Sequence, residues 1–405
     1  MATGPERREG MQADHTVHPN TAVVHAGHFV TPVNEGASPP LYQAAAYRFR
    51  DLAQVEEIYA GNVPSAIYGR YGGPNGAQFA GAIAELEGAQ SAFASANGMS
   101  AIDAALATNL PVGAALVATR DIYGGTYELL MHEYAAPRAQ VTFVDQSNCA
   151  EVEAALIRTQ ARVLYTEALT NPLMGVADID ALAAITKRLG VLLIIDATFA
   201  SPALIQPLAH GADLVVHSVT KYLGGHGDVG AGVVAGREEL IAPIREHLIR
   251  TGATVAHFDA WLATRGLRTL GLRMERHSSN ANRVAAYLAS VPAVLRVHHP
   301  SLASHAQHEL AKRLYPQGTG GMLAFDLAGG RDGVDRFLRG LRRIAIVHSL
   351  GEVATTIGYS AVSSHRGLPA QLREELGVTD GTLRLSVGIE HCDDIIADLA
   401  QGFRS

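Results

Sequence analysis

Lysine is scarce in this chain of 405 residues. Only three of its 32 basic residues are lysines, and the other 29 are arginines. An arginine guanidinium stays protonated and cannot form an imine with a carbonyl compound, whereas a lysine amine can. Arginine therefore supplies most of the positive charge, and each lysine becomes a candidate for covalent chemistry.

Other absences each exclude a class of protein. The two cysteines, Cys149 and Cys392, have a spacing that suits neither a metal site nor a redox pair. The strongest apolar run, Val191–Ile195, is five residues long, far too short to cross a membrane. The net charge of −7 argues against a nucleic-acid or anionic-membrane surface, and the polar residues 1–20 contain no apolar signal core. We therefore expect a cytoplasmic protein with no membrane segment and no nucleic-acid partner.

Common binding motifs are missing as well. The 18 histidines include close pairs, such as His298 and His299, but no matching set of cysteines or carboxylates, so we expect no metal site. The glycine-rich stretch 72–76 has neither the spacing of a Walker loop nor the preceding strand of a dinucleotide fingerprint. The chemistry of this chain must therefore come from another arrangement.

The sequence does contain an alternation of strands and helices from about residue 76. Apolar runs predict strands at Ala115–Thr119, Val141–Asp145, Val163–Glu167, Val191–Asp196, Leu214–Ser218 and Gly232–Ala235. Residues 179–189 place apolar side chains on one helical face, with Asp178 as N-cap and Gly190 after the last turn. Apolar strands that alternate with helices predict an α/β protein with a mostly parallel sheet covered on both faces.

The pattern changes after residue 265. A long helix over Arg276–Ala289 is followed by β runs at Val294–Val297, Met322–Leu327, Ile344–Val347 and Leu383–Val387. A mass of 42.7 kDa is large for a single core. We predict an extended N-terminal arm over residues 1–65, a large domain over 66–265 and a smaller C-terminal α/β domain over 266–405.

Lys221 lies where such a sheet collects its ligands, at the carboxyl ends of the strands. The predicted strand Val191–Asp196 ends in a carboxylate, which either caps the next turn or pairs with a buried cation. One strand later, Ser218, Thr220 and Lys221 reach the same edge. A lysine between hydroxyl groups and a glycine run is typical of a Schiff-base lysine.

Eight motifs follow one another along the chain. They are Tyr68-Gly69-Arg70, Ser95-Ala96-Asn97-Gly98-Met99, Tyr123-Gly124-Gly125-Thr126, Glu167 with Asn171-Pro172, Asp196-Ala197-Thr198-Phe199, Ser218-Val219-Thr220-Lys221, His348-Ser349-Leu350-Gly351 and Leu383-Arg384-Leu385-Ser386-Val387-Gly388. Each is weak alone, but in this order they resemble the Cys/Met-metabolism (trans-sulfuration) family of fold-type I pyridoxal-phosphate enzymes. The resemblance runs from about Val23 to the C-terminus. It implies a large domain with a mostly parallel, seven-stranded sheet and a smaller C-terminal domain.

The resemblance also implies a cofactor, pyridoxal 5′-phosphate (PLP), bound covalently to Lys221. Asp196 would keep the pyridine nitrogen protonated, and Tyr123 would stack on the ring and act as acid or base near the leaving group. The remaining cofactor-binding residues would be Tyr68, Arg70, Gly98, Met99, Asn171, Thr198, Ser218 and Thr220. Gly98 and Met99 would offer the phosphate a helix N-terminus.

Substrate binding is assigned in the same way. Arg384 would clamp the substrate carboxylate, although an interdomain salt bridge is the alternative for this residue. The other substrate-binding residues would be Asn171, Ser349 and His348. In the family, the counterparts of Tyr68 and Arg70 come from the neighbouring subunit, whereas a surface turn is the alternative for this motif. We therefore expect a homo-oligomer, at least a dimer and commonly a tetramer joined partly by N-terminal arms.

Several positions depart from the family pattern. His348 stands where cystathionine-using members often have glutamate, which weakens the case for cystathionine. Gly125 stands where methionine-degrading members often have cysteine, and Ala197 replaces an asparagine. We expect these two small residues to make room for a bulky substrate.

The expected reaction is γ-elimination or γ-replacement on an amino acid with a γ leaving group, through a vinylglycine-type ketimine. The substrate would be a homoserine ester, a homocysteine thioether or a sulfonium such as S-adenosylmethionine, with a second nucleophilic substrate in the case of replacement. One alternative is a C–S β-lyase that acts on cystathionine or cysteine. A second is a non-catalytic binding protein that retains the fold.

Overall fold

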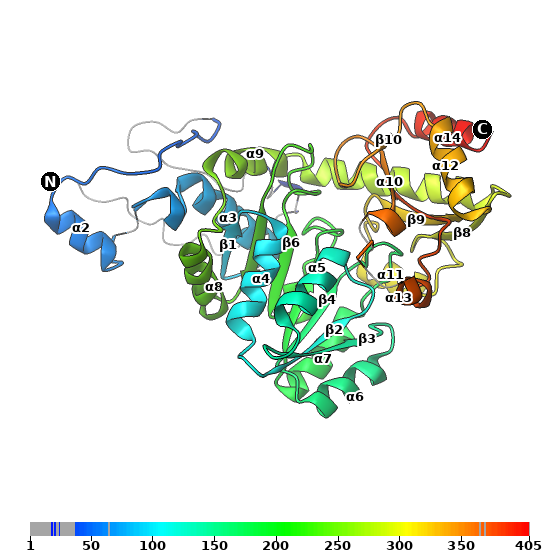
Figure 1. Ribbon diagram of the computed structural model, residues 1–405. Helices are drawn as coiled ribbons and strands as arrows, with labels where there is room; N and C mark the ends of the chain where they lie inside the picture. Colours follow the sequence, from blue (N-terminus) through cyan, green and yellow to red (C-terminus); the bar gives the residue numbers. More distant parts are fainter. Residues whose placement is uncertain are drawn as a thin grey trace.

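The computed structural model describes residues 18, 20, 21, 24, 37–63, 65–363, 366–367 and 370–404. The chain forms two β-sheets with helices packed on them, and an N-terminal segment extends away from the larger sheet (Figure 1). Most of the predicted lead over residues 1–20 lies outside the described residues.

The larger sheet has seven strands in the order β1-β7-β6-β5-β4-β2-β3. They are β1 (Ser91–Ser95), β2 (Ala115–Thr119), β3 (Gln140–Val144), β4 (Val163–Glu167), β5 (Leu192–Asp196), β6 (Leu214–Ser218) and β7 (Gly232–Gly236). Only β7 runs antiparallel to its neighbours, so the prediction of a mostly parallel, seven-stranded sheet is confirmed. The carboxyl ends of β4, β5 and β6 lie side by side, and Glu167 pairs in register with Asp196.

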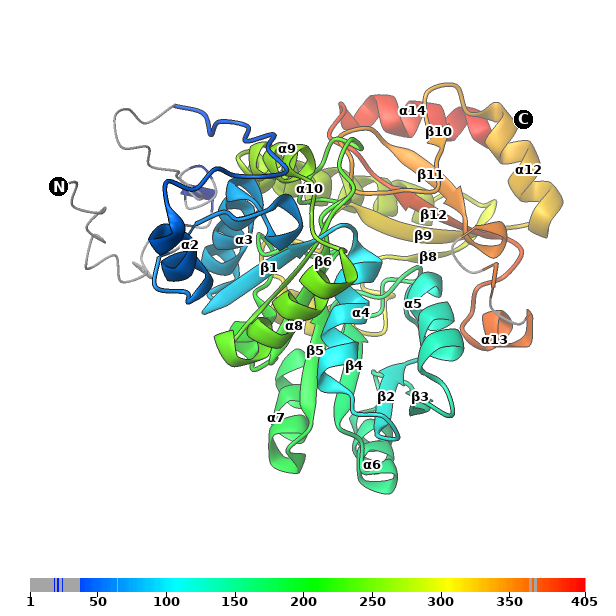
Figure 2. The same cartoon turned by 60° about the vertical axis from the view of Figure 1, so that its left-hand side comes forward.

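Helices cover both faces of this sheet, because its buried strands carry apolar side chains on both sides. One face is packed by α3 (Pro74–Glu87), α6 (Cys149–Thr159), α7 (Ile179–Leu189) and α9 (His257–Leu267). The other is packed by α4 (Gly98–Asn109), α5 (Gly124–Leu129), η2 (Leu130–Tyr134) and α8 (Glu238–Thr251), as Figure 2 shows. Two of these helices begin directly after strands, at the edge of the sheet where the parallel strands end. Helix α4 follows β1, and α5 follows β2.

The predicted ends of α7 are confirmed. The Asp178 side chain accepts a hydrogen bond from the Ala181 N–H at 3.3 Å, and Gly190 follows the helix with φ 65°. A carboxylate at the N-terminus and a left-handed glycine after the last turn are favourable at these two positions. The local sequence is sufficient to place this helix.

The smaller sheet has five strands in the order β10-β11-β12-β9-β8. They are β8 (Val294–His298), β9 (Met322–Leu327), β10 (Ala345–Ile346), β11 (Thr356–Tyr359) and β12 (Thr382–Ser386). The helices α10 (Leu270–Ala289), α12 (Gly330–Gly340) and α14 (Cys392–Gly402) share an apolar core with it. The short elements are η1 (Gly69–Tyr71), η3 (Pro207–His210), α11 (His308–Leu314), η4 (Ser360–Val362) and α13 (Ala370–Glu375).

Three predictions of secondary structure were incomplete. Strands β1 and β11 were not predicted, and α10 begins at Leu270, ahead of the predicted start at Arg276. The first half of α10 mixes polar and apolar residues, and Leu270 and Met274 pack against the core of the larger sheet. Tertiary contacts therefore extend this helix beyond the segment that its sequence pattern indicates.

The N-terminal segment carries helix α2 (Leu52–Tyr59), which lies apart from both sheets (Figure 1). Leu52, Tyr59 and Val63 expose 71%, 62% and 46% of their surface, a large apolar area for a short segment. Within the described residues, no helix has the length and apolar character needed to cross a bilayer. The domain limits at residues 65 and 265 stay predictions.

Candidate active site

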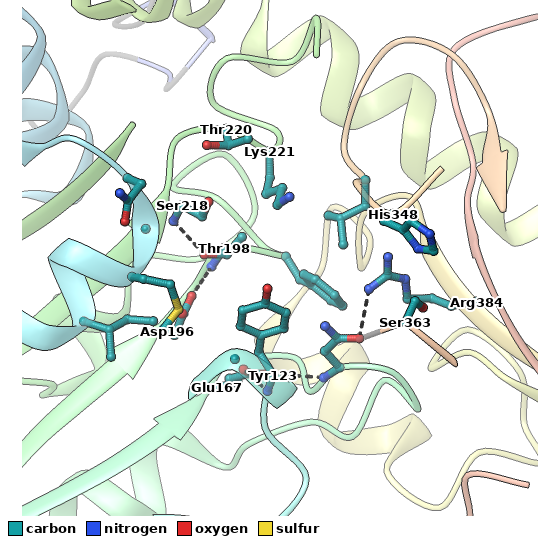
Figure 3. Close-up of a pocket in the computed structure, with 18 of the residues that line it drawn as sticks. Tyr123, Glu167, Asp196, Thr198, Ser218, Thr220, Lys221, His348, Ser363 and Arg384 are labelled. Carbon is teal, nitrogen blue, oxygen red and sulfur yellow. Dashed lines mark hydrogen bonds between the residues drawn. The ribbon is translucent and has the colours of Figure 1, made fainter. Parts of the chain in front are cut away.

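A cavity of about 530 Å³ lies at the carboxyl ends of β4, β5 and β6, between the two sheets (Figure 3). Eleven of the predicted site residues line it: Gly98, Met99, Tyr123, Asn171, Asp196, Thr198, Ser218, Thr220, Lys221, His348 and Arg384. The first nine belong to the large sheet and the segments that follow its strands, whereas His348 and Arg384 come from the smaller one. The site is therefore built where the two halves of the chain meet.

Lys221 follows β6 and points into this cavity (Figure 3). Its Nζ donates a hydrogen bond to Ser349 Oγ at 3.0 Å, and no carboxylate within the described residues forms an ion pair with it. Burial and the positive charge of Arg384 lower the pKa of Lys221 to about 8. A larger fraction of this amine is therefore deprotonated, and nucleophilic, near neutral pH than of an ordinary lysine.

Asp196 ends β5 at the same edge and is 8% exposed. Its Oδ1 accepts the Thr198 N–H at 2.9 Å, and its Oδ2 accepts the Tyr165 hydroxyl at 3.2 Å. Burial raises the pKa of Asp196, although these hydrogen bonds oppose the rise. Among the described residues no arginine, lysine or histidine forms a salt bridge with it, so the carboxylate lines the cavity without a direct ionic partner.

Glu167 is a site residue to which the sequence analysis gave no role of its own. It ends β4 beside Asp196, and its two oxygens accept the backbone N–H groups of Tyr123 at 2.7 Å and Asn171 at 3.0 Å. Burial and the neighbouring charge of Asp196 raise the pKa of Glu167. Glu167 therefore positions two segments of the cavity wall, and its place within a motif was the only signal in the sequence.

The first turn of α4 forms another wall. Asn97 caps this helix, because its Oδ1 accepts the Ser100 N–H at 2.9 Å, and the N–H groups of Gly98 and Met99 lie in the first turn. A Cβ at Gly98 would lie 2.8 Å from Ser218 Cβ, so only glycine lets the helix approach β6 this closely. Thr198 Oγ1 accepts the Ser218 N–H at 2.8 Å and ties this wall to Asp196.

Tyr123 precedes α5, and its ring stands at the centre of the cavity (Figure 3). A Cβ at Gly125 would lie 2.6 Å from Tyr123 Cε1, so the ring occupies the space next to this glycine. Ala197 is fully buried in the apolar core and does not line the cavity. The expectation that Ala197 makes room for a bulky substrate was therefore wrong. Gly125 does line the cavity, and its role in making room for a bulky substrate stays a prediction.

Arg384 lies in β12 and is 5% exposed. Its guanidinium donates to Asn171 Oδ1 at 3.2 Å and to the Ser349 carbonyl oxygen at 3.4 Å. Burial lowers the pKa of Arg384 to about 10, which leaves it charged at neutral pH. No described carboxylate pairs with it, so the interdomain salt bridge is not formed and the charge is available to an anion in the cavity.

Tyr68 and Arg70 are not brought to this cavity. Tyr68 is 46% exposed, and Arg70 donates a hydrogen bond to the Ile249 carbonyl oxygen at 2.7 Å. Ser349 is absent from the cavity lining but reaches the site through its hydrogen bond to Lys221. Further lining residues that the sequence did not indicate include Glu128, Ser363 and Arg366.

A seven-stranded, mostly parallel sheet with a lysine, a buried carboxylate and a helix N-terminus around one cavity defines the class of PLP-dependent enzymes of fold type I. The model of the family described as Cys/Met metabolism PLP-dependent enzyme matches residues 20–404. The chain belongs to this family. It is therefore an enzyme and not a non-catalytic binding protein, and its cofactor is PLP.

Individual relatives support the same assignment. The chain is 39% identical to an O-succinylhomoserine sulfhydrylase from Pseudomonas aeruginosa, over 95% of this chain and 94% of that protein. It is also 39% identical to a cystathionine gamma-lyase from Bacillus subtilis, over 95% and 99% of the two chains. The crystal structure of a cystathionine gamma synthase from Xanthomonas oryzae in complex with cystathionine superimposes with a TM-score of 0.90 at 35% identity, over 96% and 98% of the two chains.

The residues around the cavity fit PLP. Within the part of the chain that the structure describes, the carboxylate of Asp196 forms no salt bridge, and a protonated pyridine nitrogen would give it a cationic partner. The first turn of α4, beside the Ser218 hydroxyl, offers N–H groups to a phosphate. A Cβ at Gly98 would fill the space between them. Ring nitrogen and phosphate would thus both find partners within one cavity.

Uptake of PLP by the cofactor-free enzyme is expected to speed up as the pH rises through about 8, because the Lys221 amine must lose its proton before it attacks the aldehyde. The Arg384→Gln variant, which lacks a positive charge near that amine, should move the midpoint to higher pH. Stopped-flow absorbance at several pH values measures both profiles. A wild-type rate that stays constant between about pH 7 and pH 9 would contradict the lowered pKa.

Proposed function

We propose that this enzyme catalyses γ-elimination or γ-replacement on an L-amino acid that carries a leaving group on its γ-carbon. The observation that carries the proposal is the Lys221 amine, which has a pKa of about 8 and one hydroxyl partner, in the same cavity as Tyr123 and Arg384. Removal of a γ-substituent requires protons to leave both Cα and Cβ, and a lysine on a flexible stem can reach both carbons. The names of the sulfhydrylase and gamma-lyase relatives agree with such a reaction.

Arg384 is proposed to hold the α-carboxylate of the substrate, with Asn171 keeping the guanidinium in place. When bound, PLP supplies an electrophilic carbonyl carbon and a ring that accepts the electron pair released at Cα. Lys221 Nζ would take the protons from Cα and Cβ, and the Tyr123 hydroxyl would protonate the departing group. Glu167 would position Tyr123 and Asn171 through their backbone N–H groups.

β-Elimination in the same cavity is the second candidate. It needs only one carbon-bound proton to be removed, and a cystathionine beta-lyase from Lactococcus lactis is 38% identical to this chain, over 94% of this chain and 97% of that protein. The same lysine and arginine would serve either reaction. The two candidates therefore differ in which C–S or C–O bond of the substrate breaks.

A substrate panel separates these reactions. The purified enzyme with PLP is incubated with cystathionine, O-acetylhomoserine, O-succinylhomoserine, methionine or S-adenosylmethionine, with and without a thiol. 2-Oxobutanoate and ammonia would indicate γ-elimination, a γ-substituted amino acid would indicate replacement, and pyruvate would indicate β-elimination. Failure of the whole panel to give a keto acid or a substituted product would refute the proposed reaction.

The active unit is proposed to be at least a dimer, in which Tyr68 and Arg70 complete the phosphate site of the neighbouring chain. Both lie outside the cavity of their own chain, and Leu52 and Tyr59 in the adjacent arm expose apolar surface that suits a second copy. The proposal predicts that neither residue contributes to the site of its own chain.

Mixing two inactive variants tests the shared site. Lys221→Ala lacks only the lysine, and the double variant Tyr68→Phe with Arg70→Ala lacks only the phosphate ligands. If subunits exchange at random, half of the dimers are hybrids with one intact site, so activity should return to about a quarter of the wild-type value. Each variant alone serves as the control. A mixture that stays inactive after verified subunit exchange would rule out sharing.

A further inference from the structure

A buried pair of titratable residues, Glu87 and His217, lies behind the active site, and the proposed reaction uses neither of them. Glu87 is the last residue of α3, and His217 is the residue before Ser218 in β6. His217 Nε2 lies 2.6 Å from Glu87 Oε1, and both side chains are fully buried. Among the described residues, His217 Nδ1 and Glu87 Oε2 have no hydrogen-bond partner, so the two side chains are bonded only to each other.

The pair lies on the face of the sheet opposite to the cavity. Side chains alternate between the two faces along a strand. Val215, two residues before His217, packs into the core that contains α3, whereas Ser218 lines the cavity. His217 therefore does not touch a ligand in the cavity, and any influence of the pair on the site must act through the backbone or through charge.

The backbone around His217 is bonded to the segment of Asp196 on both sides. The carbonyl oxygen of the residue before it, Val216, accepts the N–H of the residue after Asp196 at 2.9 Å. The residue after it, Ser218, donates its N–H to Thr198 Oγ1, and Thr198 donates its own N–H to Asp196 Oδ1 (Figure 3). His217 is thus held against the strand end that carries Asp196.

The geometry favours an imidazolium and a carboxylate over two neutral groups. A hydrogen bond as short as 2.6 Å between these groups is favoured by charge on both partners. The opposite charges of such a pair also cancel, so the core gains no net charge. A neutral His217 beside an ionised Glu87 would instead leave an anion in the core without a cation.

Asp196 is the group that a positive charge at this place would serve. Asp196 and Glu167 are two buried carboxylates that pair in register at the ends of β5 and β4, and neighbouring like charges disfavour ionisation. Burial has the largest influence on the pKa of Asp196 and raises it, whereas the charge of His217 lowers it. A protonated His217 therefore favours the ionised form of Asp196.

We propose that Glu87 and His217 are positioning residues, which place a positive charge behind Asp196 and keep its carboxylate ionised toward the ring nitrogen of PLP. Glu87 holds the proton on His217, and His217 stabilises the anion of Asp196 across the strand. Asp196 then accepts a hydrogen bond from the protonated ring nitrogen without taking its proton. The inference rests on the role expected of Asp196, and it holds for γ- and β-elimination alike.

A purely structural role is the alternative, since the pair also ties the end of α3 to β6. Glutamine distinguishes the two roles, because it can keep a hydrogen bond between the two positions but cannot carry a charge. His217→Gln removes the positive charge, and Glu87→Gln removes the anion that holds the proton on His217. Both variants therefore keep the structural tie and lose the electrostatic effect.

The test measures the affinity of the cofactor-free enzyme for PLP and for the analogue of PLP in which C–H replaces the ring nitrogen. The ratio of the two dissociation constants, from titration calorimetry, reports the contribution of the ring nitrogen. This preference for PLP should fall about tenfold in His217→Gln and in Glu87→Gln, the effect of one charge in a buried environment. His298→Gln is the matched control, because His298 Nε2 and Asp326 Oδ2 form a buried pair at 2.9 Å in the smaller sheet. Its preference should stay within about twofold of the wild type.

The Asp196→Asn background shows whether the effect acts on Asp196. Without this carboxylate there is no anion to stabilise, so the addition of His217→Gln should change the preference by less than about twofold. A tenfold loss on that background, or an unchanged preference in both glutamine variants, would overturn the proposal. Each glutamine variant is a test on its own if the other does not fold. No substrate enters these measurements, so their outcome is separate from that of the proposed elimination or replacement.

The charge of His217 can also be measured directly. Its ring ¹⁵N chemical shifts in the cofactor-free enzyme, assigned by the signals missing from the spectrum of His217→Gln, should be those of an imidazolium at neutral pH. The shifts of a neutral imidazole would refute the proposal even if the cofactor affinities changed.

Discussion

Replacement of Lys221 by alanine is expected to lower turnover by at least about 10³-fold, because the variant loses both the amine that holds PLP and the base that moves the protons. Borohydride reduction of the wild type, followed by peptide mass spectrometry, should find the cofactor on the Lys221 peptide alone. The scarcity of lysine makes this measurement direct, because Lys187 and Lys312 are the only other candidates in the chain.

Lys187→Ala and Lys312→Ala are the matched controls. Lys187 is in the last turn of α7, and Lys312 pairs with Glu309 on α11, both outside the cavity. Each control should retain the turnover and cofactor spectrum of the wild type. Attachment of PLP to Lys187 or Lys312 in the native enzyme, or substantial turnover by Lys221→Ala, would refute the assigned role of Lys221.

The Asp196→Asn variant should lose about 10²-fold to 10³-fold in kcat while keeping its fold. The amide retains the size of the carboxylate but not the negative charge that would keep the pyridine nitrogen protonated, so the ring would accept electrons less readily. The hydrogen bonds from Thr198 and Tyr165 show that this side chain is already held in one orientation. Steady-state kinetics and the absorbance spectrum of the bound cofactor measure the two effects.

Asp332→Asn, an exposed change in the first turn of α12, serves as the control and should leave kcat unaltered. A circular dichroism spectrum and melting temperature like those of the wild type would exclude misfolding as the cause. An Asp196→Asn enzyme with full kcat and an unchanged cofactor spectrum would mean that the ring nitrogen does not depend on this carboxylate.

Much of the fold could be predicted because its signals are local. Six strands of the larger sheet are apolar runs that alternate with helices, and α7 carries its own cap and stop residues. Strand β1 (Ser91–Ser95) contains small residues and a single aromatic side chain, so its pattern is weak. Its pairing with β7 is a long-range contact that no local pattern encodes.

The residues at the strand ends could be predicted for the same reason. A polar residue directly after a buried strand must lie at the edge of the sheet, and this places Asp196 and Lys221. The role of Glu167 was not predictable in this way, because its two partners are backbone N–H groups of segments that only the fold brings together. The packing of the Tyr123 ring beside Gly125 was not predictable either, because it depends on the conformation of Tyr123.

By itself, the sequence determined the class of chemistry. The rare lysine, the carboxylate at a strand end and the start of a helix can each be recognised from a short, local stretch of sequence. Only the tertiary structure decided which residues meet at the cavity. Arg384 meets Asn171 across the two halves of the chain, and Glu128 meets Gly367 in the same way. Such pairs are far apart in sequence, and their distances depend on how the two sheets pack, so no spacing in the sequence could reveal them.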